Sequence, residues 1–135
     1  MSDSPQYTPV PPQPQGTPAP AQSGLSDNAA GAIAYITFIP AIIFLILEPY
    51  NKSSFVRFHS WQSIFLACAA VLINFVLGIF LAATFLFAPF LHLALSRLVE
   101  LFWLVVWVLC LVNAWQGKRF KLPLIGALAE QQANR

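Results

Sequence analysis

The chain has 135 residues, of which 58% are hydrophobic and only 9% are charged, with a formal net charge of +2. A soluble domain carries roughly 25% charged residues, so this composition argues against that class and favours a protein that faces lipid. The few cations gather near the ends of apolar runs, which disfavours nucleic-acid binding. Both cysteines lie inside apolar runs, so neither a disulfide framework nor a zinc site is predicted.

Residues 1–25 hold most of the prolines, together with Gln, Ser and Thr, and contain no Lys or Arg. Such a segment cannot bury enough apolar surface to fold, so it is predicted to be a disordered tail. Its proline pairs leave recognition by a proline-binding partner open beside the plainer interpretation of a solvated tail. The tail lacks the basic and apolar regions of a cleavable signal, so the first apolar run is expected to stay in the mature protein.

The first apolar run, residues 29–47, is uncharged and is close to the roughly 20 residues that a helix needs to cross the hydrocarbon layer. Ser26 or Asp27 is placed to cap its N-terminus. Pro40 removes one backbone donor and crowds the preceding turn, so a kink is predicted near Thr37. This run is expected to be the first transmembrane helix.

Two further apolar runs, residues 64–87 and 98–115, are predicted to be the second and third transmembrane helices. Ser53 or Ser54 is placed to cap the second helix, and Pro89 is placed to begin the third. The expected fold is therefore an all-α integral membrane protein with three transmembrane helices.

The C-terminal segment mixes cations with apolar residues and follows the transmembrane domain, which is expected to span residues 26–117. Residues 118–135 are predicted to form a basic amphipathic segment that lies on the bilayer surface. Lys118, Arg119 and Lys121 would meet anionic lipid headgroups for about 1 kcal/mol each near the surface.

A polar and aromatic stretch joins the first two apolar runs and carries the densest polar chemistry in the chain. It is typical of the water-to-lipid boundary, where its residues would anchor the protein, and a cytoplasmic docking surface is the functional alternative. Glu48 and His59 could form an acid–base pair, but Glu48 is more simply a partner for Arg57 or Lys52. No catalytic, cofactor or metal site is predicted. The interfacial or docking residues are Glu48, Arg57, Phe58, His59, Trp61, Gln62, Lys118, Arg119 and Lys121.

Small and polar residues recur every four positions along the second run, which predicts close helix packing in preference to a pore lining. Counting residues inward from the predicted cytoplasmic ends brings Thr37, Asn74 and Trp103 to about the same depth. We therefore expect the Trp103 indole N–H to bond the Asn74 amide oxygen. The residues predicted to pack helices are Thr37, Asn74, Gly78 and Trp103.

Topology follows from the positions of the cations. With three spans, one side of the membrane carries a single Lys or Arg, Arg97, and the other side carries six. The positive-inside rule then predicts a multi-pass protein of the inner (plasma) membrane, with the N-terminus outside and the C-terminus in the cytoplasm. The six cations are Lys52, Arg57, Lys118, Arg119, Lys121 and Arg135.

Two segments carry a resemblance to a known family. The stretch Glu48-Pro49-Tyr50-Asn51-Lys52, followed by residues 55–63, and the closing residues 117–126 resemble a bacterial membrane-protein family of unknown function. That family is related to the twenty-kilodalton Tic component of chloroplast protein import, and the resemblance covers residues 26 to about 132. It implies a helical integral membrane protein with a part in protein translocation.

The function that the sequence favours is that of an interaction or structural subunit of a membrane complex, without catalytic chemistry. A component of a translocation or transport assembly that resembles the Tic import component is the alternative. The expected partners are the lipid bilayer with its anionic headgroups, and either further copies of the chain in a homo-oligomer or other membrane proteins; no cofactor is expected.

Overall fold

A computed structural model describes residues 24–135, and every element in this part of the chain is helical. Most of the predicted disordered tail lies outside the described residues. The elements in chain order are α1 (Asp27–Ile33), α2 (Phe38–Ile46), the short 3-10 helix η1 (Tyr50–Lys52), α3 (Ser54–Phe87), α4 (Pro89–Trp115) and α5 (Ile125–Ala133).

The two long helices α3 and α4 form an antiparallel hairpin, and both are long and apolar enough to cross a membrane. Ser53 caps α3 by accepting a hydrogen bond from the Val56 N–H at 3.4 Å, and Pro89 is the first residue of α4, as predicted. We call the turn at Ala88 the distal end of the hairpin, and the end where α3 begins and α4 finishes the proximal end.

The first apolar run is broken into two short helices instead of forming one kinked helix. Ser26 caps α1 through the Ala29 N–H, α1 ends at Ile33, and α2 begins after Thr37, whose backbone is extended. Pro40 falls in the first turn of α2, where its missing N–H removes no intrahelical hydrogen bond. The proline therefore sits at a helix start, and the chain reverses direction before it.

Both ends of this broken segment lie at the proximal end of the hairpin. The Leu25 N–H donates to the Tyr50 hydroxyl at 2.8 Å, and the Ser53 hydroxyl donates to the Asp27 carboxylate at 2.6 Å. The segment thus enters beside α3 and returns to the same end, so the predicted first transmembrane helix is not confirmed. The prediction that residues before α1 and after α4 lie on opposite membrane faces depends on that helix and is not confirmed either.

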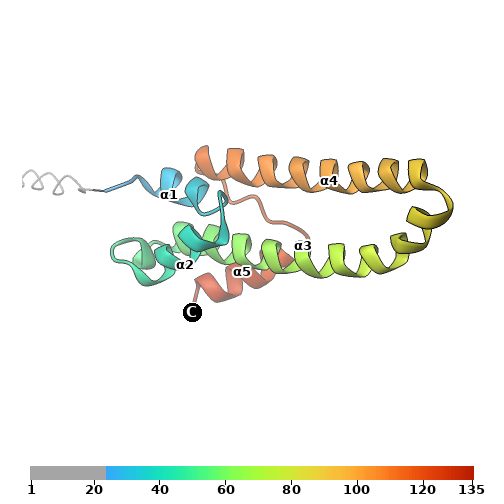
Figure 1. The fold of residues 1–135 in the computed structure, drawn as a ribbon. Coiled ribbons are helices and arrows are strands. Elements are labelled where there is room, and N and C mark those ends of the chain that lie inside the picture. Colours follow the sequence, from blue (N-terminus) through green and yellow to red (C-terminus); the bar gives the residue numbers. More distant parts are fainter. Residues whose placement is uncertain (1–23) are drawn as a thin grey trace, which may run out of the picture.

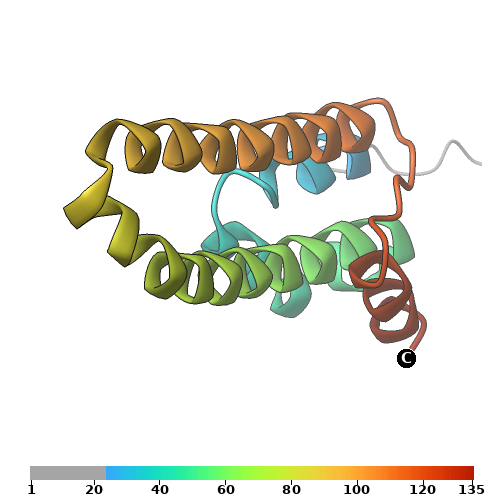
Figure 2. The same ribbon diagram turned by 90° about the vertical axis from the view of Figure 1, so that its right-hand side faces the viewer.

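The short helices gather around the proximal end and leave the distal turn alone (Figures 1 and 2). Helix α1 packs against α4 and α3, while α2 and α5 pack against α3. One core cluster joins α1, α2 and α3 through Ala30, Ala41, Phe44 and Val56. All of this packing is concentrated in one half of the molecule.

Candidate functional site

The reversal between α1 and α2 is held by two side chains of the long helices. The Ser63 hydroxyl donates to the Ala34 carbonyl and the Trp107 indole N–H donates to the Tyr35 carbonyl, each at 2.6 Å. These bonds satisfy carbonyls that a broken helix leaves without partners. Non-helical backbone at membrane depth is tolerated only where protein groups or water satisfy it in this way.

Close contact between α1 and α3 depends on Gly31. A Cβ at this position would lie 2.9 Å from Phe55 Cε1 and 3.3 Å from His59 Cδ2, which is tighter than ordinary van der Waals contact. Only a residue without a side chain lets α1 lie this close to α3 while leaving the His59 ring in place.

A buried polar network lies next to this contact and links four segments of the chain. The Gln62 amide N–H₂ donates to the Tyr35 hydroxyl at 3.0 Å and to the Phe120 carbonyl at 2.9 Å, and it lies 3.8 Å from Cys110 Sγ. The Tyr35 hydroxyl lies 3.1 Å from His59 Nδ1. His59 and Gln62 are fully buried and Tyr35 is 3% exposed.

Tyr35 and His59 share the hydrogen bond at the centre of this network. The Tyr35 oxygen accepts from Gln62, and its O–H can donate to Nδ1 of His59 when the imidazole is protonated on Nε2. Nε2 itself has no partner among the described residues. The network joins the reversal, α3 and the C-terminal segment.

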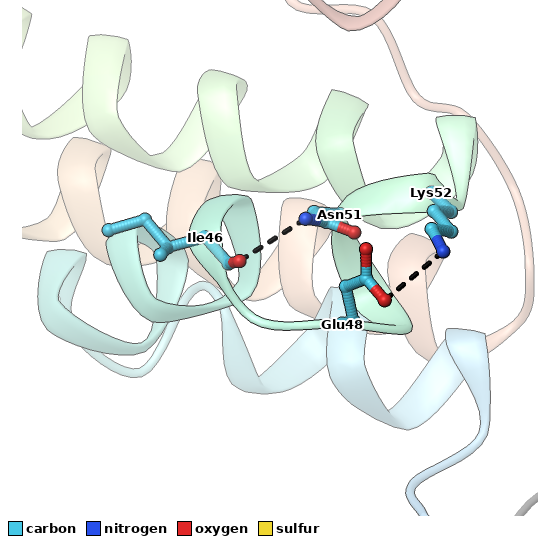
Figure 3. A network of polar contacts seen from close by, with 4 residues as sticks. All are labelled: Ile46, Glu48, Asn51 and Lys52. Carbon is cyan, nitrogen blue, oxygen red and sulfur yellow. Dashed lines mark hydrogen bonds and ion pairs between the residues drawn. The ribbon is translucent and has the colours of Figure 1, made fainter.

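Glu48 does not approach His59. Its carboxylate pairs with Lys52 at 3.1 Å in the connection between α2 and α3, where the Asn51 side-chain amide also donates to the Ile46 carbonyl at 3.2 Å (Figure 3). Both charged side chains are well exposed. The simpler of the two predictions for Glu48, a pair with Lys52, is confirmed.

The predicted interfacial residues come together with the C-terminal segment. Phe58 is fully buried in a cluster with Ala129 and Ala133 of α5, and the ring of Trp61 stacks on Phe65 at the edge of that cluster. Residues 118–133 thus pack on the protein in addition to any contact with lipid.

Cations also join the start of α3 to the C-terminal segment, and we call this contact region the proximal junction. The Arg57 guanidinium donates to the Gln132 carbonyl at 3.1 Å. Its positive charge there stabilises the negative end of the α5 helix dipole. Arg119 donates to the Ser54 hydroxyl at 2.6 Å, and Lys121 pairs with Glu130 at 2.7 Å. Lys118 is exposed.

The residues predicted to pack helices are only partly brought together. Thr37 and Trp103 line one cavity of about 560 Å³ next to the reversal between α1 and α2. Asn74 and Gly78 line a different cavity of about 230 Å³ between α3 and α4. Asn74 donates to the Ala70 carbonyl within its own helix at 2.7 Å. Among the described residues Trp103 Nε1 has no partner, so the predicted Trp103–Asn74 hydrogen bond is wrong.

The error has a physical cause. The depth of Thr37 was counted on the assumption that residues 29–47 cross the membrane, but the segment reverses at this residue. A Cβ on Gly78 would meet nothing within 4 Å, so the predicted close packing at this glycine is not made within the chain.

Sequence reasoning missed the residues that organise the proximal end. Tyr35, Trp107 and Cys110 lie inside apolar runs, where each was interpreted as part of a span or as core, and Ser63 ends the polar stretch without a predicted partner. A usable signal was present, because a tyrosine hydroxyl in the middle of an apolar run needs a buried partner. Within residues 24–135, no group of three His, Cys, Asp or Glu side chains is arranged to hold a metal ion.

Comparison with known proteins gives related membrane proteins. Residues 26–129 match the family described as the magnetosome magnetite crystal formation protein family, MamF/MmsF. A UPF0132 membrane protein of Methanocaldococcus jannaschii is 42% identical over 109 residues, which cover 80% of this chain and 89% of that protein. A second UPF0132 membrane protein, from Archaeoglobus fulgidus, is 32% identical over 109 residues, with 80% and 96% covered. No solved structure gives a significant match.

These matches overturn the resemblance inferred from residues 48–63 and 117–126. The matched family is not the Tic-related one, and the two relatives are archaeal instead of bacterial. The shared segments are better explained by the proximal junction, in which residues 54–62 bond to residues 119 and 120. The chain belongs to the MamF/MmsF family of membrane proteins.

Proposed function

We propose that this chain is a membrane-embedded structural subunit that assembles with further copies of itself through the distal half of the α3–α4 hairpin. The carrying observation is the polar cavity of about 230 Å³ between these helices, within segments apolar enough to span a membrane. It is lined by Asn74, His92, Ser96 and Glu100 beside apolar residues.

Polar groups in a span favour association because hydrocarbon offers them no hydrogen bonds. Asn74 is exposed and uses one N–H within its own helix, so its amide oxygen and second N–H are available. An amide both donates and accepts, and is therefore complementary to the same amide in a second copy at the same depth. Open space at Gly78 leaves room for that copy.

Assembly can be tested by measuring the mass of the purified protein in mild detergent with light scattering. The wild-type chain should form a discrete oligomer, and Asn74→Leu should shift it to the monomer. Asn113→Leu is the matched control, since Asn113 makes the same 2.7 Å bond to the carbonyl four residues earlier, at the proximal end. A monomeric wild-type chain, or an oligomer that survives Asn74→Leu, would refute the proposal.

The charges favour a two-span topology with the proximal end in the cytoplasm. Six of the seven Lys and Arg residues belong to segments at or beyond the proximal end, and Arg97 lies in the distal half. Under the positive-inside rule α1 and α2 then form a re-entrant pair that enters and leaves on the cytoplasmic side. The inner membrane remains the proposed location.

Cysteine labelling in whole cells tests this topology. Single cysteines replace Leu25, Lys52, Gln131 or Phe87 in a background that lacks Cys68 and Cys110. An impermeant thiol reagent should label only position 87, in the distal turn. Labelling at position 25 without labelling at position 52 would show that residues 29–47 cross the membrane and would reject the re-entrant arrangement.

The crystal-formation role named in the family description is not part of this proposal. Iron sites in proteins gather several His, carboxylate or thiolate ligands around the metal. The acids in the described part of the chain are dispersed, and each contacts a hydroxyl or a cation: Asp27 with Ser53, Glu48 with Lys52, Glu100 with Arg97, and Glu130 with Lys121.

A further inference from the structure

The proximal end holds more positive charge than its acids neutralise. Lys52 pairs with Glu48, and Lys121 pairs with Glu130. Four further cations there have no carboxylate within ion-pair distance among the described residues. One is Arg135, at the end of the described residues, and the other three are Arg57, Lys118 and Arg119.

These three cations lie around the first turn of α3. Arg119 reaches Ser54 and lies 5.9 Å from the centre of the Phe58 ring, while Arg57 follows Ser54 by three residues and so shares its face of the helix. Lys118 is the neighbour of Arg119 in the chain. Both arginines bond neutral oxygens, so they keep their full charge and retain N–H groups for a further acceptor.

Two exposed leucines lie a few residues after Lys118 and Arg119 in the chain. Leu124 is 85% exposed and Leu128, one turn later, is 52% exposed. Leu124 has φ +64°, in a γ-turn in which the Ile125 N–H donates to the Pro123 carbonyl at 2.7 Å. Such a conformation is strained for a residue other than glycine, yet here it turns a leucine outward, away from any protein core.

We propose that Arg57, Lys118 and Arg119 bind the phosphate of an anionic phospholipid, whose acyl chain lies along Leu124 and Leu128. Charge complementarity selects the headgroup, because phosphate oxygens match guanidinium donors. The exposed leucines select a lipid over a free phosphate ion, since only the lipid brings an apolar chain to cover them. The site lies where α3 begins, at the level of the headgroups if α3 spans the membrane.

Lipid binding is measured on the full-length protein in a neutral detergent by thermal unfolding against added lipid. Phosphatidylglycerol should raise the unfolding temperature in a saturable way, whereas phosphatidylcholine and inorganic phosphate should not. Each cation near a membrane surface contributes about 1 kcal/mol, so Lys118→Gln should weaken the apparent affinity about five-fold. Lys118→Gln with Arg119→Gln should weaken it about thirty-fold.

Two variants separate a site from a general effect of charge. Lys52→Gln removes the same charge from the same end, but Lys52 already pairs with Glu48, so the affinity for phosphatidylglycerol should stay within two-fold of wild type. Leu124→Gly relieves the backbone strain, so it should keep the unliganded unfolding temperature while weakening lipid binding. Lys118 makes no side-chain hydrogen bond or ion pair to the described residues, so its variant should fold normally.

Three results would overturn the proposal. Equal stabilisation by phosphatidylcholine would show that headgroup charge is not recognised. Equal stabilisation by inorganic phosphate would show a simple anion site without a lipid chain. An equal loss of affinity in Lys52→Gln and Lys118→Gln would show that only the total charge of the proximal end matters.

Discussion

The two halves of the hairpin differ in what surrounds them. At the proximal end α1, α2 and α5 cover α3 and α4, and fully buried side chains such as Phe58, Gln62 and Cys110 lie between them. Between residues 67 and 109 no residue is buried, and the two helices stand alone around the distal turn. One half is stabilised by contacts within the chain, and the other needs lipid or another copy to cover it.

The largest expected effect comes from Gln62→Leu, which removes the donor to the Phe120 carbonyl and the Tyr35 hydroxyl. Each buried acceptor left without a donor costs about 1–3 kcal/mol, so the free energy of unfolding should fall by about 3 kcal/mol. Reversible unfolding by a denaturing detergent in mixed micelles gives this value. Ser96→Ala in the distal half is the control and should change the value by less than about 0.5 kcal/mol. Similar losses in both variants would contradict the division between the halves.

Substitutions at two glycines, one in each half, should have opposite effects on stability. Gly31→Leu should lower the free energy of unfolding by about 2 kcal/mol, because its side chain would overlap Phe55 and His59. Gly78→Leu meets open space and should leave the monomer as stable or slightly more stable, because leucine is a better helix former than glycine. The same unfolding assay, at a protein-to-detergent ratio that keeps the chain monomeric, compares them. A larger loss at Gly78 would mean that α3 and α4 pack more tightly there than the structure shows.

The smallest effect is expected at the exposed connection between α2 and α3. Glu48→Gln breaks the ion pair with Lys52, in which both side chains are well exposed, so the loss should be about 0.5 kcal/mol or less. Unfolding measured at low and high salt should show that this small difference shrinks as salt rises. A loss near that of Gln62→Leu would show that surface charge, and not the buried network, stabilises the proximal end.

Local features of the fold were predictable because neighbouring residues determine them. Ser26 and Ser53 cap helices through bonds only three residues long, and Pro89 begins α4 because its missing N–H removes nothing there. The two long apolar helices follow from length and hydropathy in the same way.

The reversal between α1 and α2 could not be predicted because it depends on distant partners. A proline inside an apolar run is compatible with a kinked span or with two helices. The choice rests on bonds from Ser63 and Trp107 to the carbonyls of Ala34 and Tyr35, across 29 and 72 residues of sequence. The depth counted for Thr37 assumed a continuous helix, so it was wrong once the reversal was missed.

The same two bonds constrain the order in which the protein can be completed. Residues 29–47 leave the ribosome before Ser63 and well before Trp107, yet the carbonyls at their turn are satisfied only by those two side chains. Until both have been synthesised, the turn lacks the side-chain partners that it has in the finished fold. The first apolar segment to be made therefore completes its turn only after the hairpin that follows it in sequence has been made.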